Sequence, residues 1–154
     1  MRVDSGDEAP DFSLPTDGAG ELSFQSLRGK KVVLYFYPKD DTSGCTKQAI
    51  GFRDALAEFE EAGVTVVGVS KDSAAKHDKF KAKYELNFPL VADEQCTACE
   101  AYGVWVEKSM YGRKYMGIER STFLIGTDGK IAKAWRKVKI PGHVEEVLAA
   151  AKGL

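Results

Sequence analysis

The sequence predicts an α/β fold in which helices flank a mixed central sheet. Residues 32–37 and 64–69 are almost entirely apolar and rich in β-branched and aromatic side chains, which is typical of strands buried on both faces. Between these segments, apolar residues from Cys45 to Phe59 recur at steps of three and four, which predicts a helix over about 44–62. Strands of this kind occur in parallel or mixed sheets, and the order of strands and helices along the chain favours a mixed sheet.

The later part of the chain adds antiparallel strands to this core. Residues 122–125 and 131–138 flank Thr127-Asp128-Gly129-Lys130, a turn sequence that indicates a hairpin. The other expected elements are an N-terminal hairpin or extended arm within residues 1–24, a helix at 73–84 with Ser73 near its N-cap, a strand at 88–91, a short helix at 96–102 and a last helix from Pro141 to about Ala151. This order outlines a thioredoxin-like domain with an N-terminal β-hairpin extension.

Composition limits the classes of function. The chain has 154 residues, the size of one ordinary domain, and no repeat or linker divides it, so we expect a single domain over residues 1–154. Its formal net charge of −1 gives no electrostatic basis for binding nucleic acid or an anionic membrane. The longest apolar run is far shorter than the roughly 20 residues that span a bilayer. The acidic N-terminus lacks the apolar region of a signal peptide. We therefore expect a cytoplasmic protein whose three cysteines are reduced or redox-active thiols.

Cys45 is the first candidate for chemistry. A buried strand leads into a short loop, and the cysteine follows in the first turn of the expected helix. Unpaired backbone amides and the positive end of the helix dipole favour a thiolate at that position, and the thiolate is the nucleophilic form. The alternative interpretation is a small buried hydrophobic residue, because Cys45 also lies on the apolar stripe of the helix.

The residues around Cys45 favour the chemical interpretation. Pro38, Thr42 and Cys45 form a P-x-x-x-T-x-x-C string that resembles the active-site motif of peroxiredoxins. Nearly the whole chain is similar to the bacterioferritin comigratory protein subfamily, also called peroxiredoxin Q. The further segments that carry this similarity are 51–54, 68–73, 101–105 and 117–125. The resemblance implies a thiol-dependent peroxidase that reduces hydrogen peroxide and organic hydroperoxides, uses no cofactor or metal, and is mostly monomeric.

The resemblance also implies a role for each site residue. Cys45 would attack the peroxide and become a sulfenic acid, which thioredoxin or a similar thiol donor would reduce. Thr42 would offer its hydroxyl to thiolate and peroxide, and Arg120 would hold the peroxide oxygens and favour the thiolate. The backbone amides of Gly44 and Cys45 would add fixed dipoles, and Pro38 would shield the sulfur from solvent.

The cysteine that resolves the sulfenic acid is the open question. Members of the subfamily often carry it five residues after the nucleophile, where this chain has Ile50. Cys96 and Cys99 remain as possible resolving cysteines, and the alternatives are direct attack by an external thiol or two purely structural thiols. A zinc site is not expected, because zinc needs four ligands and the only histidines, His77 and His143, have no ligand spacing to this pair.

Two departures from the subfamily pattern affect the expected site. Ser43 replaces a usual proline, which predicts a more flexible loop before Cys45. Gln48 replaces a usual glutamate, which predicts a weaker hold on the active-site arginine. Residues 39–41 are interpreted as a solvated turn, and 76–83 as an exposed helix face.

Two other functions compete with the peroxidase. In the first, oxidation of Cys45 would change a surface, and the protein would be a redox sensor or regulatory partner with incidental turnover. Ile50 gives this hypothesis some support, because a sulfenic acid that is resolved inefficiently persists longer. In the second, Cys96 and Cys99 would form the redox pair of a disulfide reductase, although the sequence around them lacks the context of a thioredoxin motif.

Overall fold

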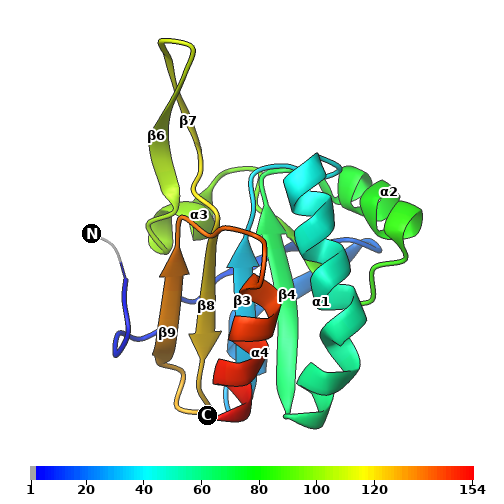
Figure 1. Ribbon diagram of the computed structural model, residues 1–154, viewed down its shortest axis with the longest axis vertical. Helices are drawn as coiled ribbons and strands as arrows, with labels where there is room; N and C mark the ends of the chain where they lie inside the picture. The colour runs from blue at the N-terminus through cyan, green and yellow to red at the C-terminus, as the bar shows by residue number, and fades with distance from the viewer. Residues whose placement is uncertain (1–2) are drawn as a thin grey trace.

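The structure, a computed structural model, describes residues 3–154 and contains a seven-stranded mixed sheet covered by helices on both faces (Figure 1). The strands are β1 (Ser13–Thr16), β2 (Gly20–Ser23), β3 (Lys31–Phe36), β4 (Val64–Ser70), β5 (Leu90–Ala92), β8 (Ser121–Ile125) and β9 (Ile131–Arg136). They lie in the order β2-β1-β5-β4-β3-β8-β9. The pairs β3–β4 and β4–β5 are parallel, and the other neighbours are antiparallel. The predicted mixed sheet and N-terminal hairpin are confirmed.

Two hydrophobic cores lie on opposite faces of this sheet. Side chains along β3 alternate between them, as the period of a strand requires. On one face Tyr35 stacks on Phe52 of α1 (Ser43–Glu61), with ring centroids 4.6 Å apart. On the other face Phe36 meets Tyr102, which follows the short helix α3 (Thr97–Ala101), at 5.2 Å. The central strands are therefore buried on both sides, as their apolar sequences predict.

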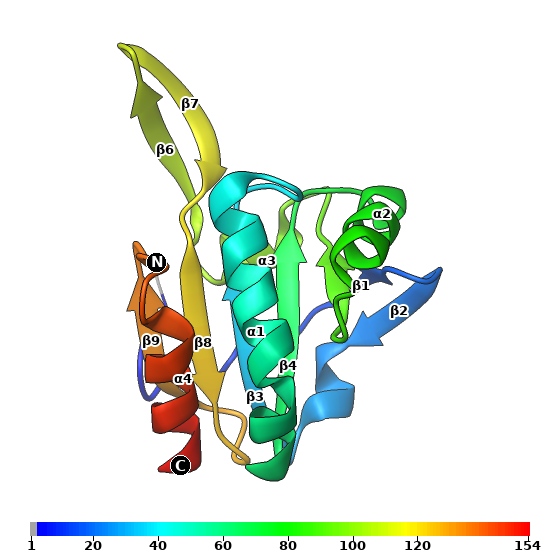
Figure 2. The ribbon, with the colours of Figure 1, turned by 45° about the vertical axis from the view of Figure 1, so that its right-hand side comes forward.

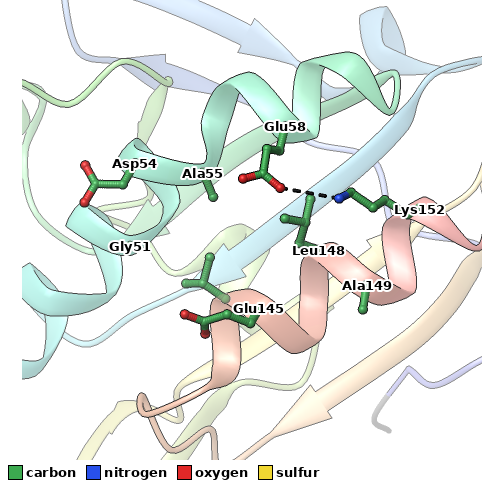
Figure 3. Close-up of a pocket in the computed structure, with 9 residues that line it drawn as sticks. Gly51, Asp54, Ala55, Glu58, Glu145, Leu148, Ala149 and Lys152 are labelled. Atoms are coloured by element: carbon green, nitrogen blue, oxygen red, sulfur yellow. Dashed lines mark hydrogen bonds and ion pairs between the residues drawn. The ribbon is translucent and has the colours of Figure 1, made fainter.

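Helices α1 and α4 (His143–Lys152) lie side by side on the first face (Figure 2). Gly51 allows this close packing, because a Cβ there would stand 2.9 Å from Cγ2 of Val144. A hollow of about 480 Å³ remains between the two helices, and Lys152 reaches Glu58 across it at 3.4 Å (Figure 3). None of the sequence-predicted site residues lines this hollow.

The remaining predicted elements are present with small shifts. Helix α2 (Ala74–Tyr84) begins after Ser73, whose side chain accepts a hydrogen bond from the amide of Lys76, so the predicted N-cap is confirmed. Strand β5 begins at Leu90, two residues later than predicted. A short 3-10 helix, η1 (Phe24–Leu27), follows β2. Within residues 3–154, no helix combines the length and apolar character needed to cross a membrane.

The sequence analysis missed one hairpin. Strands β6 (Trp105–Met110) and β7 (Arg113–Ile118) pair only with each other and project beyond the main sheet (Figure 1). Their two-residue turn, Tyr111-Gly112, has φ angles of 51° and 77°, as a hairpin turn of the primed type requires. Most of the hairpin is exposed, so it lacks the apolar run that reveals a buried strand.

Candidate active site

Cys45 lies in the first turn of α1, where a loop from the end of β3 enters the helix. It is the third residue of the helix and is only 2 % exposed. Thr42 precedes the helix in an extended conformation, and its carbonyl accepts the first helical hydrogen bond, from the amide of Thr46 at 2.8 Å. The amides of the first turn have no acceptor within the helix, and they lie at its positive end. The sulfur of Cys45 therefore lies at the end of α1 where backbone donors are unpaired.

Thr42 occupies the N-cap position of α1, but its hydroxyl makes no capping hydrogen bond. It donates its one hydrogen to the carbonyl of Lys39 at 2.9 Å, within the same loop. The oxygen keeps its lone pairs, so toward a further partner this hydroxyl is an acceptor.

Arg120 brings a positive charge to the sulfur. Its Nη2 donates to Sγ of Cys45 at 3.2 Å. The two residues are far apart in sequence, but Phe36 at the end of β3 pairs with Ser121 at the start of β8, and this register brings Arg120 beside the loop. Gly44 leaves room for the guanidinium, because a Cβ there would stand 3.3 Å from Nη2. A cation and a thiol meet at the amino end of a helix.

Gln48 orients the arginine. It is fully buried one turn after Cys45, and its Oε1 accepts a hydrogen bond of 2.5 Å from Nη1 of Arg120. Its Nε2 has no hydrogen-bond partner among the described residues. The arginine is therefore held by a neutral amide, without the charge by which a carboxylate would strengthen the contact.

Pro38 is half-buried and borders a hollow of about 340 Å³ between the loop and the β6–β7 hairpin. The lining mixes apolar and cationic side chains: Pro38, Lys39, Lys71, Trp105, Lys108, Tyr115, Met116 and Ile118, with Gly117. Burial and the charge of Arg120 lower the pKa of Lys108, and Cys45 acts in the opposite direction. Lys108 is thus within electrostatic range of Arg120 and Cys45, although Cys45 itself does not line the hollow.

The other two cysteines lie in the core on the opposite face of the sheet. Cys45 packs with the residues beneath α1, whereas Cys96 and Cys99 pack in the cluster beneath α3. All three are free thiols. The amide of Cys99 donates to Oδ2 of Asp93 at 2.8 Å, and burial together with this carboxylate raises the pKa of the Cys99 thiol well above its ordinary value. No group of three or more potential metal-ligating His, Cys, Asp or Glu side chains occurs within residues 3–154.

One sequence interpretation near the site is wrong in part. Residues 39–41 are not simply a solvated turn, since the side chain of Asp40 is 6 % exposed and contacts His77. The predicted exposed face of α2 is confirmed, since Lys76, Lys79 and Lys83 are exposed, but the opposite face of the helix buries His77 and Phe80. The spacing of His77, Phe80 and Tyr84 at steps of three and four was the available signal, hidden by the lysines between them.

Comparison with known proteins places this geometry in a family. The sequence matches the AhpC/TSA family over residues 5–134. The chain belongs to the AhpC/TSA family. A Coxiella burnetii protein provisionally named peroxiredoxin bcp is 55 % identical, over 96 % of this chain and 98 % of the relative. Peroxiredoxin Bcp of Bacillus subtilis is 46 % identical, over 100 % of this chain and 98 % of the relative.

A solved structure shares both the fold and the sequence. Bacterioferritin comigratory protein of Xanthomonas campestris, studied for its alkyl peroxide reduction activity, superimposes with a TM-score of 0.91. It is 44 % identical, and the match covers 97 % of this chain and 98 % of the other. The resemblance stated from sequence is confirmed: this AhpC/TSA member is a peroxiredoxin of the Bcp type, an oxidoreductase with peroxidase activity and a thioredoxin-like fold.

Proposed function

We propose that this peroxiredoxin reduces hydrogen peroxide and organic hydroperoxides with Cys45 as the nucleophile. The observation that carries the assignment is the 3.2 Å contact between Nη2 of Arg120 and Sγ of Cys45 at the amino end of α1. A permanent cation and unpaired amides at one sulfur favour the thiolate that peroxide reduction needs.

The chemical step is an in-line displacement at oxygen. The thiolate of Cys45 attacks one peroxide oxygen, an S–O bond forms, and the O–O bond breaks. Sulfur is oxidised to sulfenic acid, and the departing hydroxide or alkoxide takes a proton to leave as water or alcohol. Negative charge moves from sulfur to oxygen, so donors fixed near both atoms stabilise the transition state. Arg120 and the amides of Gly44 and Cys45 are the donors proposed for this role, and Thr42 is proposed to accept from the peroxide hydrogen.

The hollow beside Pro38 supports organic hydroperoxides as substrates. Its apolar wall includes Trp105, Met116 and Ile118, which suit the carbon chain of an alkyl hydroperoxide. The Xanthomonas campestris relative has been studied for alkyl peroxide reduction, which supports the same substrate class here.

An external thiol is the proposed reductant of the sulfenic acid. Cys96 and Cys99 belong to the core on the far side of the sheet from Cys45, which argues against either as an internal resolving cysteine. In the proposed route a donor thiol forms a mixed disulfide with Cys45 and releases water. A second thiol then breaks that disulfide and restores Cys45. Thioredoxin is the proposed donor, and the enzyme is proposed to act as a monomer.

Mass spectrometry after one equivalent of peroxide tests this cycle. A gain of one oxygen on Cys45, trapped by dimedone without a crosslink, is the expected result. A crosslink between Cys45 and Cys96 or Cys99 would contradict the external-thiol route. An unmodified Cys45 while peroxide is consumed would contradict the nucleophile itself. Repeated turnover with thioredoxin and its reductase separates an enzyme from a redox sensor, because a sensor would stop after one equivalent.

A further inference from the structure

A buried pair outside the reacting groups holds the loop that precedes Cys45. His77 of α2 is fully buried, and its Nδ1 lies 2.6 Å from Oδ2 of Asp40 in that loop. Its Nε2 lies 2.9 Å from the carbonyl oxygen of Val91 in β5. A carbonyl only accepts, so Nε2 carries a hydrogen, and the short contact at Nδ1 needs a second proton between nitrogen and carboxylate. One proton therefore joins the loop to the helix.

Both carboxylate oxygens and the backbone amide of Asp40 make hydrogen bonds to residues outside the loop or at its start. Its Oδ1 accepts from the hydroxyl of Tyr37 at 2.6 Å, and its backbone amide donates to Oδ2 of Asp72 at 2.8 Å. Asp72 in turn accepts from the hydroxyl of Ser70 at 2.7 Å. Asp40 thus connects the end of β3, the end of β4 and α2, five residues before the candidate nucleophile.

A second contact between the same loop and the same helix is exposed. Lys83 donates to Oδ2 of Asp41 at 2.8 Å, and both side chains are open to solvent. Exposed ion pairs contribute little, because water screens them. Lys83 therefore provides a matched control for the buried pair.

The charges around His77 determine how the pair responds to pH. Burial alone would lower the pKa of His77, but the hydrogen bond and charge of Asp40, the carbonyl of Val91 and the charge of Asp72 together raise it above 6.5. Burial raises the pKa of Tyr37, so its hydroxyl stays a donor. The hollow beside Asp40 is also lined by four cationic residues, Lys39, Lys76, Lys79 and Lys83. A raised histidine pKa gives stabilisation that is complete below about 6.5 and is lost as pH rises through the raised value. Loss of the proton leaves two acceptors facing each other.

We propose that Asp40 and His77 form a latch that positions the Cys45 loop and sets how often the loop opens, an inference that rests on the proposed role of Cys45. Closed, the latch keeps Cys45 beside Arg120, where peroxide is attacked. Cys45 is only 2 % exposed, so an external thiol reaches the oxidised sulfur only when the loop and the first turn of α1 move. Asp40 and His77 are positioning residues. Loosening the latch slows oxidation of Cys45 by peroxide and speeds reduction of its sulfenic acid by thiol.

His77→Gln tests the latch, with Lys83→Met as the matched control. We expect His77→Gln to slow oxidation of Cys45 about tenfold, since small misplacement of a reacting group costs up to about 10²-fold. We expect attack of a small thiol on the sulfenic acid to become faster by several-fold. The wild-type oxidation rate should fall as pH rises above about 6.5 through the His77 pKa, and the variant should lose that step. Lys83→Met should change each rate less than about twofold.

Hydrogen exchange separates failure of the latch from failure of the proposed function. Carried out in a Cys45→Ser background, it measures opening of residues 37–46 without peroxide chemistry, and His77→Gln should raise exchange there while Lys83→Met does not. Equal exchange and equal pH profiles in the two variants would overturn the latch, whatever the fate of Cys45. If His77→Gln fails to fold, Asp40→Asn, which preserves size, and the wild-type pH series decide the question by the same criteria.

Discussion

Cys45 and Cys99 are both buried, but the charged group beside Cys45 is positive and the one beside Cys99 is negative. Cys45 is 2 % exposed and Cys99 is fully buried. Cys45 opens a helix of 19 residues and faces a guanidinium. Cys99 lies in a helix of five residues beside the Asp93 carboxylate, and burial and that charge raise the pKa of its thiol. We therefore expect the charge of the neighbouring group to add to burial in separating the reactivity of the two cysteines.

The largest expected effect on the rate comes from removing the sulfur of Cys45, and removal of the Cys99 sulfur is the comparison. Cys45→Ser should lower the rate of peroxide consumption by about 10³-fold or more, because no other thiolate lies at a prepared donor set. Cys99→Ser should leave the rate within about threefold, since this residue contributes packing only. Stopped-flow measurement with hydrogen peroxide checks both. Comparable losses in the two variants would break the contrast between the cysteines.

Removal of the cation should come next in size. Arg120→Met should slow oxidation of Cys45 by about 10²-fold, the usual effect of deleting one fixed donor from a transition state. Arg120→Lys should recover only part of the rate, because one ammonium replaces a fork that bonds both Sγ and Gln48. Circular dichroism should show both variants folded. A wild-type rate in Arg120→Met would mean that the helix terminus alone activates the sulfur.

Neutralising Asp93 should make the reactivity of Cys99 toward alkylation more similar to that of Cys45. In the native protein at about pH 8, iodoacetamide should modify Cys45 and leave Cys99 untouched, because a raised pKa keeps Cys99 as the unreactive thiol until far higher pH. Asp93→Asn should increase alkylation of Cys99 by about tenfold, the effect of about one pKa unit on the thiolate fraction. Peptide mapping gives the site of modification. Unchanged protection in Asp93→Asn would assign it to burial alone.

The smallest effect is expected at Gln48. Gln48→Glu should raise the oxidation rate about threefold, because a carboxylate would hold Arg120 by a charge-assisted bond. The opposite result, a slower enzyme, would show that added negative charge near the sulfur outweighs better orientation of the arginine. The second-order rate constant, measured beside Gln48→Ala, distinguishes the two effects.

Local patterns predicted the core of the fold, and the family resemblance supplied Arg120 as the expected partner of Cys45. The apolar strands and the stripe on α1 are properties of short windows, so the position of Cys45 at a helix start followed directly. The contact with Arg120 depends on the antiparallel register of β3 and β8, which no spacing in the sequence encodes. Residue types around Pro38 and Thr42 identified the family, and the family indicated the arginine.

The features that escaped prediction lack a local signal or carry a misleading one. The β6–β7 hairpin has few buried side chains, and its Tyr111-Gly112 turn was the only mark it left in the sequence. Asp40 stands in a run of charged residues that is typical of solvent exposure, but its partner His77 comes from an element 37 residues away. Burial of a polar group depends on such a distant partner, so it cannot be predicted from the run itself.

The lack of a side chain at Gly44 determines how closely Arg120 can approach Cys45. The φ of Gly44 is ordinary, so the residue is not required for a turn, but a methyl group there would stand 3.0 Å from Ile140 and 3.3 Å from the guanidinium. Any larger residue would push the arginine outward and lengthen its reach to sulfur. The absence of a side chain at Gly44 thus leaves the guanidinium of Arg120 room to lie 3.2 Å from the sulfur of Cys45.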